Sequence, residues 1–171
     1  FDVDGDTTIG FLAGVTGTTV DIANGSTLTV NQGTNGTVAG TIQGGGALTK
    51  GGAANLILTG NNTYTGTTTV DGGVLEIKNA GLLSGNGGIV VNSGEVETDG
   101  GGLGTGQSVT LNGAGQNSLL DLNGDEQIAS LAGVGTVDFN SMLTINQATN
   151  TVFSGNLVGN GNLEKSGAGS L

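Results

Sequence analysis

Residues 44–77 read GGGALTKGGAANLILTGNNTYTGTTTVDGGVLEI. Short apolar bursts such as Leu56-Ile57-Leu58 alternate with threonine and are closed by Gly, Asn or Asp, which is typical of short strands joined by turns. Apolar residues do not recur at helical spacing, and each glycine in a helix interior would cost about 1 kcal/mol. This stretch therefore predicts β-strands and no helix.

The same rhythm extends outward over most of the chain, with a burst about every 8 to 12 residues. We expect strands near residues 18–22, 26–30, 37–42, 47–49, 55–59, 67–70, 74–77, 89–91, 95–98 and 108–111. This spacing suits an antiparallel sandwich as well as a solenoid.

The composition limits what kind of core the strands can build. The 171 residues include 37 Gly, 24 Thr and 18 Asn but no Pro. Regular Val, Ile and Leu bursts favour order over the disorder that high glycine often indicates. The aromatic residues are Phe1, Phe11, Tyr64, Phe139 and Phe153. A narrow aliphatic core is therefore expected.

The charge of the chain excludes several kinds of partner. Fourteen acidic residues against three lysines give a formal net charge of −11. Such a chain would repel nucleic acid and anionic membrane surfaces. No apolar run approaches the roughly 20 residues that span a bilayer, so direct membrane insertion is not expected. Without Cys or His, disulfides, thiolate metal sites and the commonest general base are excluded.

An internal repeat links the two ends of the chain. Residues 2–15 match 121–134 at an offset of 119, and residues 26–56 match 141–171 at an offset of 115, with 15 identities in 31 positions. The offset shrinks because TGTTVDIANG is shortened to GTVDFN, a change that a surface turn tolerates. We therefore predict one continuous unit over 1–171 with an internal repeat, 2–56 with 121–171.

Long-range repetition with uneven turns favours the solenoid, because each coil of a solenoid contacts only its neighbours. Small residues and Asn also stack well from coil to coil, and Asn ladders satisfy one another's amides. Coils of roughly 20 residues give about eight coils. Thr, Asn and Asp are expected to face water. The expected inward residues are Val20, Ile22, Leu28, Val30, Leu48, Leu56, Leu58, Val70, Leu75, Ile77 and Val90.

The 44–77 motif resembles the autotransporter-associated β-strand repeat, also called the passenger-associated transport repeat. The residues that fit the pattern are Gly44, Gly46, Leu48, Lys50, Gly52, Leu56, Leu58, Gly60, Asn62, Tyr64, Gly66, Thr68, Val70, Gly73 and Leu75. Ala54 stands where the family usually has Gly, and a truncated copy begins at Gly159. The resemblance implies a right-handed, single-stranded parallel β-helix that is exported through an outer membrane by its own C-terminal barrel. Because the chain begins at Phe1 without a signal segment, we interpret it as part of a longer protein.

The sequence offers one candidate calcium loop, Asp2, Asp4 and Asp6. Its glycine, Gly5, stands two positions too early, and Ala13 replaces the acidic twelfth residue. The repeat has Asp121, Asn123 and Asp125, so recurring Asp-Gly turns explain both copies without a metal. We predict no metal site.

Glu95, Glu97 and Asp99 alternate with Val96, which places the carboxylates on one strand face at about 7 Å spacing. Such a pair suits glycoside hydrolysis, but a solvated acidic edge that prevents strand pairing explains it as well. The glycines of 100–104 lack a following Lys-Ser or Lys-Thr and are expected to form a loop. Thr67, Thr68 and Thr69 are expected at exposed strand positions. No catalytic or cofactor-binding residue is predicted.

We therefore expect a structural stalk of a secreted bacterial autotransporter passenger at the cell surface, which assists export by folding outside. The expected partner is its own outer-membrane barrel. An adhesin module that binds host glycans, matrix or another copy of itself is the alternative, and a polysaccharide-acting β-helix enzyme comes third.

Overall fold

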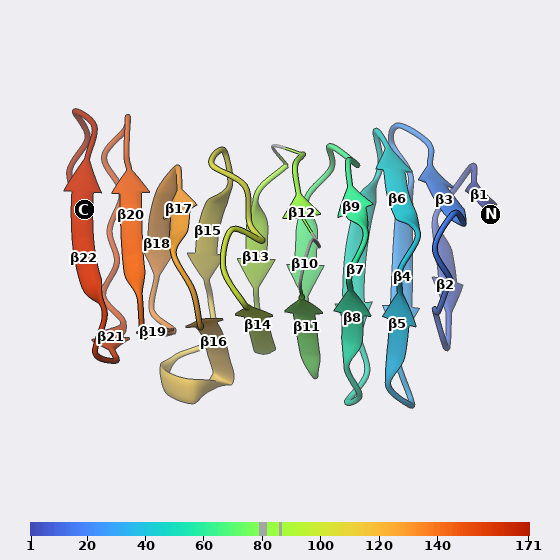
Figure 1. Cartoon of the computed structure of the whole chain (residues 1–171), viewed down its shortest axis with the longest axis horizontal. Helices are drawn as coiled ribbons and strands as arrows, with labels where there is room; N and C mark the ends of the chain where they lie inside the picture. The colour runs from blue at the N-terminus through green and yellow to red at the C-terminus, as the bar shows by residue number, and fades with distance from the viewer. Residues whose placement is uncertain (79–81, 86) are drawn as a thin grey trace.

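The chain folds into a parallel β-solenoid of about eight coils, described by a computed structural model over residues 1–78, 82–85 and 87–171. The coils stack along one long axis with the two termini at opposite ends (Figure 1). Every strand pair is parallel. The predicted solenoid is confirmed, and a sandwich is excluded.

Each complete coil contributes one strand to each of three faces, in the chain order third face, first face, second face. The first face is one seven-stranded sheet. Its strands are β2 (Thr7–Ile9), β4 (Thr27–Asn31), β7 (Ala47–Gly51), β10 (Thr68–Val70), β13 (Ile89–Val91), β15 (Ser108–Leu111) and β18 (Ser130–Gly133).

The second face is also a seven-stranded sheet. Its strands are β5 (Gly36–Val38), β8 (Leu56–Leu58), β11 (Val74–Ile77), β14 (Gly94–Thr98), β16 (Ser118–Leu122), β19 (Thr136–Phe139) and β21 (Asn156–Val158). A short 3-10 helix, η1 (Gly115–Asn117), precedes β16.

The third face is broken into three smaller sheets. Its strands are β1 (Asp2–Val3), β3 (Thr19–Ile22) and β6 (Thr41–Gly44), then β9 (Asn61–Asn62) and β12 (Leu82–Leu83), then β17 (Glu126–Ile128), β20 (Met142–Asn146) and β22 (Asn162–Ser166). Between β12 and β17 the loop 101–106 takes the place of a strand: Leu83 N–H donates to Gly102 O (2.8 Å) and Gly101 N–H to Asp125 O (2.9 Å).

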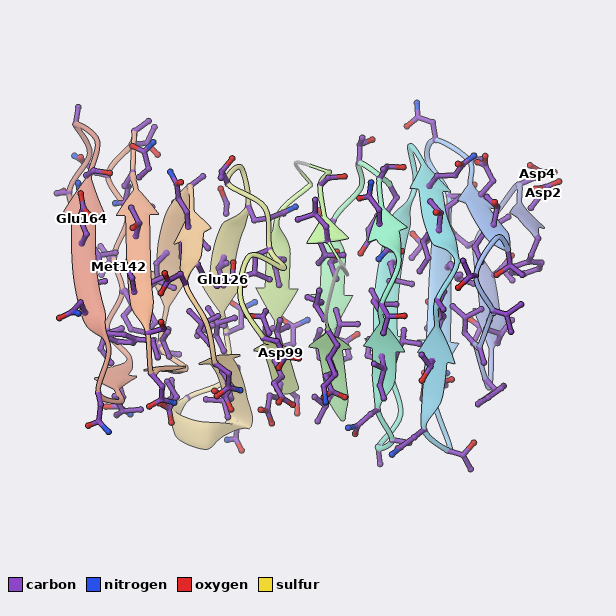
Figure 2. The ribbon with its side chains drawn as sticks, viewed as in Figure 1. Asp2, Asp4, Asp99, Glu126, Met142 and Glu164 are labelled. Carbon is purple, nitrogen blue, oxygen red and sulfur yellow. The ribbon has the colours of Figure 1, made fainter. Side chains whose placement is uncertain are left out.

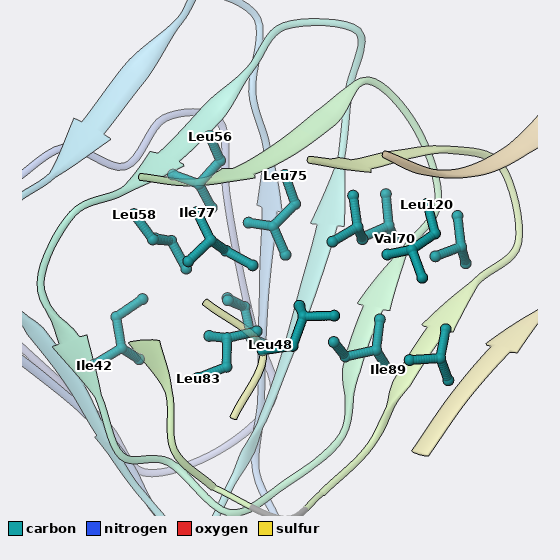
Figure 3. Close-up of a cluster of buried hydrophobic side chains, with 14 of the residues drawn as sticks. Ile42, Leu48, Leu56, Leu58, Val70, Leu75, Ile77, Leu83, Ile89 and Leu120 are labelled. Atoms are coloured by element: carbon teal, nitrogen blue, oxygen red, sulfur yellow. The ribbon is translucent and has the colours of Figure 1, made fainter. Parts of the chain in front are cut away.

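The coil length follows from the strand register. Leu28 pairs with Leu48 and Leu48 with Thr68, 20 residues each time. The expected burst at 37–42 forms two strands, β5 and β6, because a corner falls between them. Alternation within each strand turns one set of side chains inward, and a single aliphatic column fills the interior (Figure 3).

Ten of the eleven residues expected inward are buried, and Val90 is the exception. Ile89 and Val91 are buried instead, while Val90 is half-buried. Alternation cannot choose between the two settings of three consecutive apolar residues. The register does so, because Ile89 pairs with Thr68 and Val91 with Val70, both of which point inward.

The expectation that Thr and Asn face water is wrong at several positions. Asn62 is fully buried, where its Oδ1 accepts from Ile42 N–H (3.0 Å) and its Nδ2 donates to Gly60 O (2.8 Å). The Asn62 amide thus satisfies one backbone N–H inside β6 and one backbone carbonyl just before β9. The expected Asn ladder is present on the outside, where Asn112 Nδ2 donates to Asn92 Oδ1 (2.7 Å) and Asn92 Nδ2 to Asp71 Oδ1 (2.8 Å).

The two segments that match in sequence occupy different faces. Strands β2, β4 and β7 form part of the first face, whereas their counterparts β17, β20 and β22 lie on the third. The bridge Gly14–Val38 joins the second face, and its counterpart Gly133–Phe153 joins the first. Six steps along the first-face sheet lead from β2 to β18, and β17 lies one face before β18. The two segments are therefore five and two-thirds coils apart.

Candidate functional surfaces

One aspartate of each Asp-rich turn accepts a hydrogen bond from a backbone N–H on the next coil. Asp6 Oδ1 accepts from Thr27 N–H on the next coil (2.9 Å). At the matching position Asp125 Oδ1 accepts from Met142 N–H (3.0 Å) and from the Ser141 hydroxyl (2.5 Å). These two bonds lower the pKa of Asp125. Asp2 and Asp4 project from the N-terminal end (Figure 2).

Glu95 and Glu97 both lie on the outer face of β14 with Val96 buried between them, as expected, whereas Asp99 follows the strand. The expected acidic edge is wrong, because β14 lies between β11 and β16 inside the second-face sheet. The pattern along a single strand does not indicate which parallel strands lie on either side of it.

The register of the second face lines up four carboxylates on adjacent strands. Glu76 pairs with Glu97, Glu97 with Asp121, and Asp121 with Asp138. Adjacent strands stand about 4.8 Å apart. We call these four residues the acidic ladder.

Burial is the main electrostatic effect on the ladder, and charge repulsion adds to it. Burial raises the pKa of Glu97 and of Asp121, and the neighbouring carboxylates raise both further. Glu76 is buried and paired with Lys78. Within the described ranges, no three acidic side chains converge as a metal site would require. The acidic ladder is therefore a row of carboxylates across adjacent strands of the second face and not a metal site within the described residues.

The break in the third face is organised by a buried carboxylate that the sequence analysis missed. Glu126 is 4% exposed, and its Oε1 accepts from the Thr98 hydroxyl (2.7 Å) and from Gly102 N–H (2.9 Å). Its Oε2 accepts from Leu103 N–H at 3.4 Å. Burial raises the pKa of Glu126, and these donors oppose the shift. Glu126 thus replaces the acceptors that a strand would have supplied to the 98–103 backbone.

A hollow of about 350 Å³ opens beside this loop. Its lining residues are Gly101, Gly104, Thr105, Asp125, Glu126, Gln127, Met142 and Thr144. Figure 2 labels two of these lining residues, Glu126 and Met142. The glycines of 100–104 form this loop, as expected. Neither Glu95 nor Glu97 lines the hollow, so the candidate catalytic pair and this hollow are separate features.

Lys50 is fully buried and forms a second feature that the sequence analysis missed. Its ammonium donates to the carbonyl oxygens of Gly51 (2.8 Å), Gly52 (3.0 Å) and Gly72 (2.8 Å). Gly51 ends β7, Gly52 begins the turn that follows it, and Gly72 lies on the next coil. Burial lowers the pKa of Lys50. The signal available in sequence was its recurrence as Lys165 in a chain with three cations.

The threonine run also differs from expectation. Thr68 points inward, and its hydroxyl shares a 2.6 Å hydrogen bond with that of buried Tyr64. Thr67 Oγ1 donates to Gly87 O (3.0 Å) on the next coil, and Thr69 is half-buried. The run therefore ties coils together and is not an exposed row.

Exposed large apolar side chains gather at the two ends of the solenoid. The N-terminal end exposes Phe1, Phe11 and Val15 and holds a hollow of about 410 Å³. The C-terminal end exposes Val134, Met142, Val152, Leu157, Val158, Leu163 and Leu171. The side faces between the ends carry polar groups and half-buried strand residues.

Comparison with known proteins identifies a repeat and one similar protein. Residues 48–77 match the family described as Passenger-associated-transport-repeat. The chain is 34% identical over 155 residues to the "Adhesin BmaC autotransporter" of Brucella suis biovar 1 (strain 1330). That alignment covers 87% of this chain but 4% of the relative. No solved structure matches the chain. In the part of the chain that the structure describes, no helix is long and apolar enough to cross a membrane.

Proposed function

We propose that this chain, which carries a passenger-associated transport repeat and is similar to part of an autotransporter adhesin, is a structural stalk segment of an autotransporter passenger. The observation that carries the proposal is the dependence of each coil on its neighbours. The buried Lys50 ammonium binds carbonyls of two coils, and buried Gln32 binds Leu12 on one side and Asn55 on the other. Such a chain gains stability as each coil is added.

This architecture supports a role in export. A chain without Cys can be threaded unfolded through its own outer-membrane barrel, and each coil that docks outside disfavours backsliding. The acidic composition keeps the emerging segment soluble. The site of action is then the cell surface of a Gram-negative bacterium, and the first partner is the barrel.

The test is surface display of this chain fused between an epitope tag and an autotransporter barrel. Core residues are replaced by Asn in one variant, at Leu48, Leu56, Leu58 and Leu75, all fully buried. A control replaces by Asn the half-buried outward residues Thr29 and Thr49 of the first face and Ile57 of the second. We expect the core variant to lose surface epitope, scored by flow cytometry, and the control to keep it. Equal display of both variants would refute the role in export.

The name of the relative favours adhesion as a second candidate function. The half-buried carboxylates of the acidic ladder, Glu97, Asp121 and Asp138, offer a charged strip for host molecules or matrix, and self-association is the other form of this candidate. Displaying cells would be tested for clumping and for capture of matrix-coated beads. A passive stalk causes neither clumping nor bead capture. An adhesin causes at least one of them, and Glu97→Gln with Asp121→Asn abolishes that effect.

We propose that the chain has no catalytic activity. Glu95 and Glu97 project from the same side of one strand, so they do not flank a sugar ring from two sides as a glycosidase pair does. The polysaccharide-acting alternative requires turnover that depends on one of these carboxylates. Incubation with polysaccharide panels, compared with a Glu95→Gln, Glu97→Gln variant, tests this.

A further inference from the structure

The ladder of backbone hydrogen bonds between coils is interrupted at Gln127 on the third face. On intact strands, outward residues donate their N–H to the preceding coil, as Ala47 does to Ser26 O (2.9 Å). Gln127 is the outward residue of β17, so its N–H and C=O point toward the loop of the preceding coil. No hydrogen bond joins either group to residues 101–107, all of which the structure describes.

This gap in the ladder is bounded by one hydrogen bond at each end. Before Gln127, Gly101 N–H donates to Asp125 O (2.9 Å). After it, Ala129 N–H donates to Gln107 O (2.8 Å). Three residues of the strand side lie between these two bonds, against five residues of the loop side. Because the loop is too long to follow the strand, it bulges and leaves Gln127 unpaired. The two bounding bonds also prevent an extended peptide from pairing along β17.

The loop beside the gap is fixed from both neighbouring coils. Leu103 is fully buried, and the Glu126 carboxylate on the following coil accepts from Gly102 N–H and Leu103 N–H. Toward the preceding coil, the side-chain amide of buried Gln107 donates to Leu83 O (3.1 Å). The gap is therefore organised before a ligand arrives, which lowers the entropic cost of binding.

The unpaired groups of Gln127 border the hollow of about 350 Å³ beside this loop, which is large enough for one sugar ring. The other polar side chains of its lining include Thr105, Asp125 and Thr144, whose hydroxyl and carboxylate groups can bind ring hydroxyls. Met142 is 37% exposed and adds an apolar contact for a methyl group. The hollow thus combines one free backbone donor, one free backbone acceptor and an apolar wall.

The geometry points to this hollow as a binding site for a neutral sugar that carries an acetamido group, an N-acetylhexosamine. The acetamido carbonyl accepts from Gln127 N–H, its methyl group contacts Met142, and a ring hydroxyl donates to Gln127 O. The net charge of −11 disfavours acidic sugars. This inference goes beyond the stalk role and gives the adhesion candidate a ligand class. It is tested on the purified chain, so its failure and the failure of surface display are separate results.

The first test titrates the isotope-labelled chain with N-acetylglucosamine, N-acetylgalactosamine and glucose and follows the backbone amides by NMR. We expect at least one acetamido sugar to shift the Gln127 and Thr105 amides to saturation. Glucose should bind at least about tenfold more weakly, because it lacks the acetamido contacts. N-acetylglycine methylamide, a peptide with the same acetyl group, should also bind more weakly. No saturable shift with either acetamido sugar, or equal binding of glucose or of the peptide, would overturn the proposal.

A pair of proline variants tests the gap itself. Proline inside a sheet removes a ladder hydrogen bond, but at Gln127 that bond is missing already. Gln127→Pro should therefore lower the Tm by less than about 3 °C and abolish sugar binding. Thr29→Pro, on a strand that is paired on both sides, should lower the Tm by about 6 °C or more. Equal losses of Tm would show that Gln127 is paired, which contradicts the proposal.

A second pair of variants leaves the backbone unchanged. Thr144→Met places a longer side chain in the hollow, whereas Thr29→Met makes the same change at a half-buried outward position of the first face. We expect Thr144→Met to weaken sugar binding at least about tenfold and Thr29→Met to leave it unchanged. Undiminished binding by Thr144→Met would place the sugar elsewhere and reject this site.

Discussion

The segments 2–56 and 121–171 have matching sequences but different surroundings. Leu48 and Lys50 lie in the middle of the first face, while Leu163 and Lys165 lie exposed on the third. Matching hydrogen bonds are kept. Asp6 and Asp125 each accept from the first N–H of the paired strand on the following coil, and Asn35 and Asn150 each accept from an N–H 20 residues later. The two copies share turns and side-chain directions because they share a local sequence. The number of residues that precede each copy determines the face of the solenoid on which it lies.

The change of face gives one pair of carboxylates a new neighbourhood. In the first segment Asp2 pairs with Asp21 at the N-terminal end of the third face. The matching pair, Asp121 and Asp138, lies on the second face beside Glu97. Because of the shift by one face, the second pair extends the row begun by Glu76 and Glu97. The acidic ladder is thus a product of both the repeat and the residues between its copies.

The largest expected difference between the segments is in the core leucines. Leu48→Ala should lower the free energy of unfolding by about 2–5 kcal/mol, because a fully buried side chain leaves a cavity. Leu163→Ala should cost less than about 1 kcal/mol, because 41% of this side chain is already exposed. Urea unfolding measures both. Equal costs would mean that the end surface is covered in solution.

The buried glutamines provide the next comparison. Gln32 Oε1 accepts from Leu12 N–H (2.8 Å), whereas the Oε1 of Gln147 has no partner among the described residues. Gln32→Met should cost about 1–3 kcal/mol, because it leaves Leu12 N–H unsatisfied. Gln147→Met should cost clearly less. The two variants are compared by urea unfolding, and a larger loss for Gln147 would contradict the assigned bonds.

A smaller, pH-dependent effect is expected from the acidic ladder. Burial and neighbouring carboxylates raise the pKa of Glu97 in the folded state, so its ionised form disfavours folding above that pKa. The cost disappears as the pH falls through the folded pKa toward the unfolded value of about 4.3. The Tm should therefore rise as the pH is lowered from neutral toward about 4.3. Glu97→Gln should reduce this rise, whereas Glu164→Gln, on the exposed end strand, should leave it intact.

The smallest effect is expected at the matched aspartates. The Ser141 hydroxyl and Met142 N–H lower the pKa of Asp125, so its stabilising contribution is present above the unfolded value of about 3.9 and is lost as the pH falls through the folded pKa. Asp125→Ala should lower the Tm at pH 7 and match the parent protein in strong acid. Asp6→Ala, which removes a bond to Thr27 N–H without a serine partner, should have the smaller effect at pH 7. The reverse order in thermal melts would show that Ser141 contributes little.

The sequence predicted the architecture because it repeats over a long range with uneven turns, which favours a solenoid, while the family resemblance implied parallel coils. Short apolar bursts closed by Gly, Asn or Asp predicted most strand positions, including β4, β7 and β14. The expected stalk, the absence of a metal site and the domain division stay predictions. Val90 was placed wrongly because alternation inside one strand has two settings, and only pairing with a neighbouring coil selects between them.

The features missed from the sequence arise between coils. The burial of Lys50 was not predicted, because its three acceptors are backbone oxygens, one of them 22 residues away. Glu126 was not singled out, because its donors Thr98, Gly102 and Leu103 lie on another coil, where a loop replaces a strand. The ladder needs the register of four strands, which a pattern along one strand does not contain.

The spacing of five and two-thirds coils has a consequence for any array that repeats this unit. Successive copies would present the same side chains at azimuths one third of a turn apart, and the fourth copy would regain the orientation of the first after 17 coils. At about 4.8 Å per coil this is a pitch of about 80 Å. A patch present once in each unit would follow a helical path around the array, so it would be accessible from every side.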